Sequence, residues 1–389
     1  MILRDLAPVS RSSGPTAAAL FSAVLLAVAF LPSLPAPLLV FVALAPWLAA
    51  LARMERPAEG ARAGAWFFTL FWALHLAWML PLALRIRHPW PWMAYAGQVA
   101  SLGLLGAAVG AGIVALRRRR VGLIPAAAVS WVAGEWVRAS LLGPLDFPWS
   151  GIALPLARLP VLIQPAAWGG EALVALGVVA VNGGVAEALA RPGPAVSSPL
   201  GIRACLGGSM GRSVALVAAW TALGAGRMEF LQHRIEPRVE ALAVQPAVAL
   251  EVKRGPDAFE AAVLSLRQGL RTASEFLGSR HPGLSVVVFP ETHLPAVVGP
   301  GGQPAEPPEG RGLRPMDPSI LRDMIAWSDA HGVDLLLGAY QRGDEGVMNA
   351  VLHLSRDGLE GSYGKVGLIP GVERAPGGLV PGPGALPLE

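Results

Sequence analysis

Long apolar stretches fill the first 225 residues of the chain and constrain its fold more than any other feature. A helix needs about 20 mostly apolar residues to cross a bilayer, because its backbone polar groups find no partner in lipid. Seven stretches are predicted spans: Thr16–Leu31, Leu34–Leu51, Gly64–Leu84, Trp92–Leu116, Val121–Leu141, Ala166–Ala190 and Ser213–Ala225. The sequence therefore predicts a multi-span α-helical membrane bundle over residues 1–226, with about seven spans.

The charged residues support this division. They make up 15% of the chain, whereas a soluble globular protein carries about 25%. Most acidic residues follow residue 226, so residues 227–389 are predicted to form a soluble domain. The net charge of +4 does not indicate a nucleic-acid partner, because no basic stretch carries interleaved aromatic residues.

Arginines in the loops predict the orientation, because cytoplasmic loops are enriched in Lys and Arg. The richer side holds Arg4, Arg11, Arg53, Arg56, Arg62, Arg117 to Arg120, Arg191, Arg203 and Arg212. The other side holds Arg85, Arg87 and Arg158. The N-terminus is therefore predicted to be cytoplasmic, and the domain after the seventh span is predicted to lie on the opposite side.

The second domain has the pattern of an α/β fold. Short apolar strands are predicted at 238–248, 283–291 and 333–340, and two further strands at 347–365 around the turn "RDG". Amphipathic helices are predicted at Asp257–Gly278 and Pro318–Gly332, and Pro300–Arg314 is predicted to be a long loop. Strands that alternate with helices indicate helices packed on a sheet.

Three charged residues in this domain are candidates for chemistry. Glu291 follows the strand "VVVF" after a single proline, at a strand end where functional groups of α/β sheets gather. Partial desolvation there would raise its pKa toward that of a general base; the alternative is a solvated residue that opens a loop. Lys365 also follows a strand and is either a fixed cation for an oxyanion or a surface lysine. Glu373 either orients these groups or faces water.

The only cysteine, Cys205, lies in the predicted cytoplasmic loop between the sixth and seventh spans. In this topology it cannot meet Glu291, so we interpret it as a loop thiol. A single cysteine excludes a disulfide or a cysteine-based metal site within the chain, and no metal or cofactor is predicted.

Polar residues inside the predicted spans have two interpretations. They are His75, Gln98, Glu135, Arg138, Glu171 and Asn182. They either serve helix packing or line a polar, substrate-facing cavity. Glu135 and Arg138 are three residues apart on one helix face, so they are expected to be able to pair.

Several segments together resemble a known family. "ALAVQPAV", "VVVFPETHLP", "LLLGAYQR", "MNAVLHL" and "GSYGKVGLIPGVERAPG" occur in order, and "AGEWVRASLLGPLDFPWSGIALPLA" lies in the membrane part. This pattern resembles the bacterial apolipoprotein N-acyltransferases, which carry a domain of the carbon–nitrogen hydrolase (nitrilase) superfamily. The resemblance implies a four-layer αββα sandwich, incomplete here, located in the periplasm and attached to a bundle in the bacterial inner membrane.

The resemblance also implies an activity. A cysteine thiolate takes a fatty acyl chain from a phospholipid, and the N-terminal amino group of a diacylglyceryl-cysteine apolipoprotein accepts it. By this resemblance Glu291 is the general base, Lys365 stabilises the oxyanion and Glu373 is the supporting carboxylate. No cofactor is implied.

The chain departs from the family pattern in three places. The nucleophilic cysteine is expected beyond Glu389, as is a final membrane span, and Arg254 stands where the family usually has tryptophan. The chain is thus expected to be a C-terminally truncated portion of a longer protein, inactive by itself. The alternatives are a pseudoenzyme that binds lipid or lipoprotein without chemistry, and a transporter based on His75, Glu135 and Glu171.

Overall fold

The computed structural model describes residues 14–86, 89–190, 208–234, 239–253, 255–279, 283–369, 373–374 and 378–383. Cys205, Arg254 and five of the loop arginines (Arg4, Arg11, Arg87, Arg191 and Arg203) lie outside the described residues. The chain forms two compact units, Met1–Arg234 and Ile235–Glu389. Each unit is described by itself.

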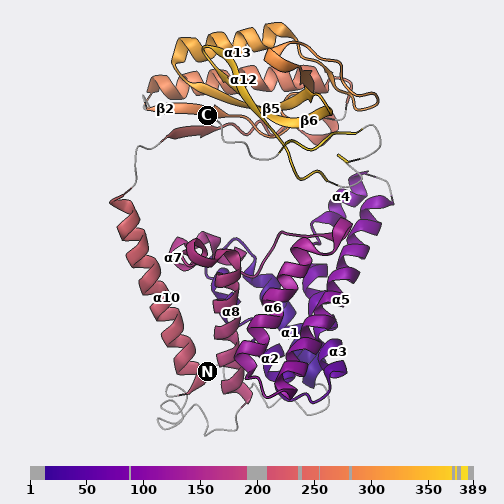
Figure 1. The fold of residues 1–389 in the computed structure, drawn as a ribbon, viewed down its shortest axis with the longest axis vertical. Coiled ribbons are helices and arrows are strands. Elements are labelled where there is room, and N and C mark those ends of the chain that lie inside the picture. The colour runs from indigo at the N-terminus through magenta and orange to yellow at the C-terminus, as the bar shows by residue number, and fades with distance from the viewer. Residues whose placement is uncertain are drawn as a thin grey trace. The chain divides into compact units, whose positions relative to one another are not determined.

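The described residues of the first unit form helices joined by turns and irregular segments (Figure 1). Its elements are α1 (Gly14–Ala29), η1 (Ala36–Phe41), α2 (Ala45–Leu51), α3 (Pro57–His75), α4 (Met79–Ile86), α5 (Trp90–Arg118), α6 (Leu123–Ser140), η2 (Gly143–Leu145), η3 (Leu154–Arg158), α7 (Pro160–Ile163), α8 (Ala166–Ala190) and α10 (Ser209–Gln232).

Fewer helices than the seven predicted spans are, by length and composition, able to cross a membrane on their own. Among the described residues these are α5, α8 and α10, and the pair α3 and α4, bent by 55°, is a fourth candidate. The predicted first span corresponds to α1, whose 16 residues are fewer than the about 20 that a helix needs to cross a bilayer. The predicted second span is not continuous: η1 and α2 replace it, because Pro35, Pro37 and Pro46 lack the N–H that a helix interior needs.

Asn182 of α8 compensates for this break between η1 and α2. Its side chain is fully buried. It accepts a hydrogen bond from the Leu44 N–H at 2.8 Å and donates to the Val40 carbonyl at 2.8 Å. Asn182 therefore has the packing role that was one of its two interpretations, since it satisfies backbone groups that the broken helix leaves unpaired.

Helices α3 and α5 approach each other through paired glycines. A Cβ on Gly64 would lie 2.0 Å from the Gly106 carbonyl oxygen, and a Cβ on Gly60 would lie 2.4 Å from that of Gly110. The two glycines of each helix are separated by three residues, and this spacing of small residues lets membrane helices pack backbone to backbone. Only glycine fits at these crossings.

The second unit is a mixed sheet with helices on one face (Figure 1). Its elements are β1 (Glu240–Ala243), α11 (Leu250–Lys253), α12 (Ala258–Ser279), β2 (Leu284–Val288), β3 (Ala296–Val298), η4 (Pro300–Gly302), β4 (Arg314–Pro315), α13 (Pro318–His331), β5 (Asp334–Gly343), β6 (Gly346–Ser355) and β7 (Gly358–Gly364). The order β1-β2-β5-β3-β4 is parallel, and β6 and β7 continue antiparallel from β5.

The predicted helices and the strands predicted after residue 283 are confirmed to within a few residues, whereas the strand predicted at 238–248 is shorter and covers only Glu240–Ala243. Gly332 ends α13 in the left-handed region at φ 64°, as expected. The short strands β3 and β4 were not predicted, because two or three residues carry no periodicity. The described residues of this unit form one sheet, which α12 and α13 cover. The four-layer αββα sandwich is not seen in these residues and stays a prediction.

We predict that Asn182→Ala destabilises the helical unit by about 1–3 kcal/mol, because two buried backbone groups lose their partner. Unfolding of the purified protein in detergent measures this loss. Thr221→Ala is the control, since the Thr221 hydroxyl bonds only to Val217 of its own helix. Equal stability of the Asn182→Ala variant and the wild type would contradict the assigned role.

Candidate active site

Glu291 lies on a loop that interrupts a line of strand pairing along β5. At the end of β2 the Phe289 N–H donates to the Leu336 carbonyl at 2.8 Å. The pairing resumes where the Leu294 N–H donates to the Gly338 carbonyl at 3.0 Å, just before β3. Residues 290–293 therefore project out of the sheet between two neighbouring hydrogen bonds, and they form what we call the 290–293 loop.

Local chemistry explains this interruption. Pro290 has no N–H with which to continue the hydrogen-bonded strand, and Thr292 adopts φ 51°, outside the extended region. The loop lies directly against Gly338 of β5, where a Cβ would be 2.1 Å from the Pro290 carbonyl oxygen and 2.8 Å from the Glu291 Cα. A residue larger than glycine at 338 would displace the loop and Glu291 with it.

Lys365 meets both predicted carboxylates. Its backbone is fixed after β7 by hydrogen bonds to the Asn349 carbonyl (2.7 Å) and from the Gly382 N–H (2.9 Å). Its Nζ lies 3.0 Å from Glu291 Oε1 and 2.9 Å from Glu373 Oε2. Lys365 therefore contacts both carboxylates that the sequence analysis nominated, one of them 74 residues earlier in the chain.

Asn349 joins the same cluster and was missed by the sequence analysis. Its side chain is 2% exposed on β6. Its Nδ2 donates to Glu291 Oε1 at 2.6 Å and to Glu373 Oε1 at 3.0 Å. An amide in the apolar segment "MNAVLHL" was the available signal, but only the pairing of β6 with β5 and β7 shows where it points.

The charges in the cluster support one another. Burial alone would lower the pKa of Lys365, but hydrogen bonds to Glu373 and Glu291 outweigh it, so this pKa lies above its ordinary value. Burial would raise the pKa of Glu373, but the Ile369 N–H, Lys365 and Asn349 hold it below its ordinary value. Lys365 is therefore a cation and Glu373 an anion at neutral pH.

Glu291 is the reachable member of the cluster. Its side chain is 59% exposed, compared with 29% for Lys365 and 12% for Glu373. The predicted desolvation of Glu291 is therefore not found in this structure. An accessible carboxylate beside a fixed ammonium can accept a proton while the ammonium stabilises a developing oxyanion. Among the described residues, no group of three His, Cys, Asp or Glu side chains could hold a metal ion.

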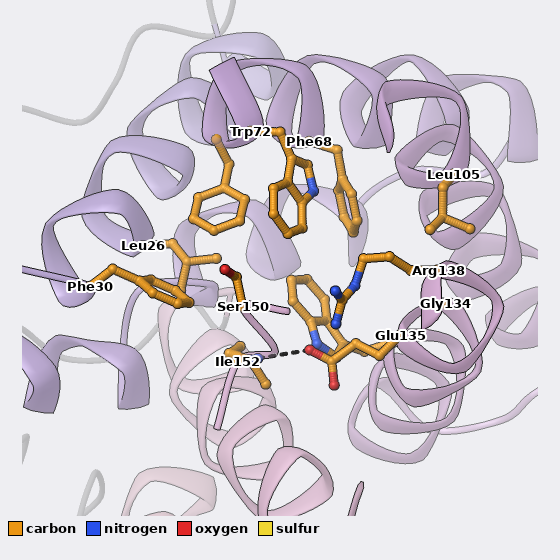
Figure 2. A pocket seen from close by; sticks show the side chains of 12 residues that line it. Leu26, Phe30, Phe68, Trp72, Leu105, Gly134, Glu135, Arg138, Ser150 and Ile152 are labelled. Atoms are coloured by element: carbon orange, nitrogen blue, oxygen red, sulfur yellow. Dashed lines mark hydrogen bonds between the residues drawn. The ribbon is translucent and has the colours of Figure 1, made fainter. Parts of the chain in front are cut away.

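The polar residues of the helical unit have a different role. Arg138 donates to the carbonyls of Phe147 and Trp149, and Glu135 Oε1 accepts from the Ile152 N–H at 2.8 Å (Figure 2). His75 Nε2 lies 2.8 Å from the Ser150 hydroxyl.

Together these three residues fasten the segment 147–152 to α6 and α3. Glu135 and Arg138 were expected to be able to pair with each other. In the structure both form hydrogen bonds to this segment. The cavity that they line has a volume of about 20 Å³, room for about one water molecule. For Glu135 and Arg138 the geometry favours the packing interpretation over a polar, substrate-facing cavity, whereas Glu171 lines a larger cavity of about 360 Å³.

The match to a family model concerns the N-terminal part of the chain. Residues 22–184 match the family model of the apolipoprotein N-acyltransferase N-terminal domain. An apolipoprotein N-acyltransferase from Rhodopirellula baltica is 35% identical over 165 residues, which are 39% of this chain and 27% of the relative. The match thus spans little more than a quarter of the relative's length, and the family model does not extend to the α/β unit.

We predict that Gly338→Ala destabilises the α/β unit by about 1–3 kcal/mol, because the added methyl group overlaps the 290–293 loop. Chemical denaturation followed by intrinsic fluorescence measures this change. Gly278→Ala is the matched control, since a Cβ there meets no atom within 4 Å in α12. It should be neutral or stabilising by up to about 1 kcal/mol. Equal effects of the two substitutions would contradict the close approach at Gly338.

The lowered pKa of Glu373 predicts acid sensitivity. The unfolded chain binds this proton more readily, so the cluster contributes stability above the ordinary pKa of 4.5 and loses it as pH falls through the folded pKa. Unfolding between pH 7 and pH 3 should show a steeper acid loss in the wild type than in Glu373→Gln. Glu345→Gln, in the exposed β5–β6 turn, is the control and should follow the wild type. Parallel wild-type and Glu373→Gln curves would contradict the prediction.

Proposed function

We propose that this chain, whose residues 22–184 match the family model of the apolipoprotein N-acyltransferase N-terminal domain, serves the transfer of a fatty acyl chain from a phospholipid to the N-terminal amino group of a diacylglyceryl-cysteine apolipoprotein. The observation that carries the proposal is the contact of Glu291, Lys365 and Glu373 in the α/β unit. The family match and the cluster come from different parts of the chain and support the same chemistry.

The cluster suits the two halves of such a reaction. In the first, Glu291 accepts the proton of the cysteine thiol that this chemistry requires, which none of the described residues supplies, and the thiolate attacks the ester carbonyl carbon of the phospholipid. The ester C–O bond then breaks, and the lysophospholipid oxygen takes the proton from Glu291. In the second half the acceptor amine attacks the thioester carbonyl carbon and loses a proton to Glu291; the C–S bond then breaks, and the leaving thiolate takes this proton from Glu291.

Lys365 has the electrostatic role in both halves. Each half passes through a tetrahedral intermediate with a negative oxygen, and an ammonium held before the reaction stabilises that charge without reorganisation. The contacts with Glu373 and Asn349 hold Lys365 and Glu291 in place. Glu373 is thus a positioning residue, and the exposed Glu291 is the base.

The helical unit accounts for the location of the substrates. Donor and acceptor are both anchored in lipid, so the reaction belongs at a membrane surface. We place the bundle in a bacterial inner membrane with its N-terminus in the cytoplasm, and the α/β unit in the periplasm as a nitrilase-like domain. The apolar helices α5, α8 and α10 support the membrane assignment by length and composition.

A second candidate function is a pseudoenzyme that binds lipid or lipoprotein without chemistry. The observation that favours it is that no cysteine lies beside Glu291 and Lys365 among the described residues. Labelling with a radioactive phospholipid separates the two functions, because only the enzyme forms a thioester that hydroxylamine cleaves.

We predict that Glu291→Gln and Lys365→Ala each lower acyl transfer by about 100-fold or more, since each removes a group that acts in the transition state. The assay uses membranes that contain the product of the whole open reading frame, a phospholipid donor and a diacylglyceryl-cysteine peptide. Glu360→Gln is the control, because Glu360 contacts Ser355 away from the cluster. Near-normal transfer in either variant would remove that residue from the mechanism.

A further inference from the structure

A second feature of the α/β unit lies beside the cluster. It is a cavity of about 430 Å³, large enough to hold part of a small ligand. We call it the basic cavity. Its walls come from α11, the start of α12, the 290–293 loop, the segment before β4, and β5.

The basic cavity carries positive charge. Lys253 and Arg311 line it, and no carboxylate is among its lining residues. The Lys253 side chain is exposed to solvent, whereas Arg311 is half-buried and donates to the Glu373 carbonyl at 3.0 Å. One cation is thus accessible at the surface and the other is fixed deeper, next to the cluster.

The remaining polar groups of the basic cavity are neutral. His293 is 4% exposed, and burial together with the charge of Lys253 lowers its pKa to about 4. The contact between its Nε2 and the Ser265 hydroxyl is long, at 3.4 Å. Burial, and then the charge of Glu373, raise the pKa of Tyr340, which therefore keeps its proton as a hydrogen-bond donor. An anion meets two cations and a hydroxyl donor here, with no negative lining group.

The basic cavity and the cluster share a wall. Glu291 of the 290–293 loop belongs to the cluster, and the next two residues, Thr292 and His293, line the cavity. Tyr340 lines the cavity from β5 and is paired with Asn349 of the cluster on β6. A ligand in the cavity is therefore next to the groups proposed to do the chemistry.

We propose that the basic cavity binds the phosphate group of the phospholipid acyl donor through Lys253 and Arg311. This inference rests on the proposed function and adds to it the means by which the donor is recognised. Arginine and lysine are the side chains that bind phosphate oxygens with charge-assisted hydrogen bonds.

The chemistry of the two substrates supports this assignment. In a glycerophospholipid the ester carbonyl is a few bonds from phosphorus, so a phosphate held in the cavity lets the ester reach Glu291 and Lys365. The amino group of the acceptor is a cation when protonated, and Lys253 and Arg311 would repel it. The basic cavity therefore distinguishes the donor from the acceptor and from neutral diacylglycerol.

The test is a binding measurement on the full chain in a neutral detergent. Isothermal titration compares dihexanoyl phosphatidylglycerol, dihexanoylglycerol and inorganic phosphate. We expect the phospholipid to bind, and dihexanoylglycerol to bind at least about tenfold more weakly, since it lacks the charge-assisted hydrogen bonds. Lys253→Glu and Arg311→Gln should each weaken phospholipid binding by about tenfold or more.

Two controls keep the result interpretable. Arg267→Ala removes an exposed cation of α12 that pairs with Asp323 outside the cavity, and it should leave binding unchanged. Because Arg311 also holds the Glu373 backbone, the exposed Lys253 is the decisive position, and thermal unfolding verifies that its variant is folded. Equal affinity for phospholipid and dihexanoylglycerol, or unchanged binding in Lys253→Glu, would overturn the inference.

The free phosphate arm separates the two sources of the ligand. Inorganic phosphate that binds as tightly as the phospholipid would identify a site for the free anion and overturn the donor assignment. Failure here is distinguishable from failure of the proposed function. Glu291→Gln should keep phospholipid binding while it abolishes transfer, whereas Lys253→Glu should impair both.

Discussion

Every buried backbone N–H and C=O needs a partner, and this constraint determines where both units can depart from regular structure. Between η1 and α2 the released groups are taken by Asn182. Backbone groups of the segment 147–152 form hydrogen bonds with the side chains of Arg138 and Glu135. In the α/β unit, β5 accepts hydrogen bonds on either side of the 290–293 loop. Each irregular segment is thus fixed by a specific neighbour. In the α/β unit the fixed segment is the 290–293 loop, which carries the carboxylate of Glu291.

The cluster of the α/β unit depends on balance between like and unlike charges. Glu291 and Glu373 would repel each other without Lys365 between them, and Asn349 adds a neutral donor to both. Asn349 lies on β6, and Lys365 directly follows β7, the strand that pairs with β6. Glu291 comes from the other side of β5. The arrangement therefore requires the mixed sheet, in which an antiparallel hairpin extends a parallel core.

The sequence predicted these units unequally well. The amphipathic helix α12 and the apolar strands β2 and β5 follow from periodicity, because burial acts on them residue by residue. The second span was predicted as continuous although it is broken, because hydropathy averages over the prolines that break it. Glu291 and Lys365 could be nominated from their places after strands. Asn349 could not, since its role exists only through partners 58 and 24 residues away.

Gly338 gives the geometry of the α/β unit a simple signature. It touches no charged group of the cluster, yet a Cβ there would overlap the peptide that carries Glu291. A chain with this loop but with a bulkier residue at the corresponding place on β5 must set its carboxylate at a different height above the sheet. The presence or absence of glycine at this position of β5 therefore indicates whether a related sequence can build the same centre, even before its acidic residues are compared.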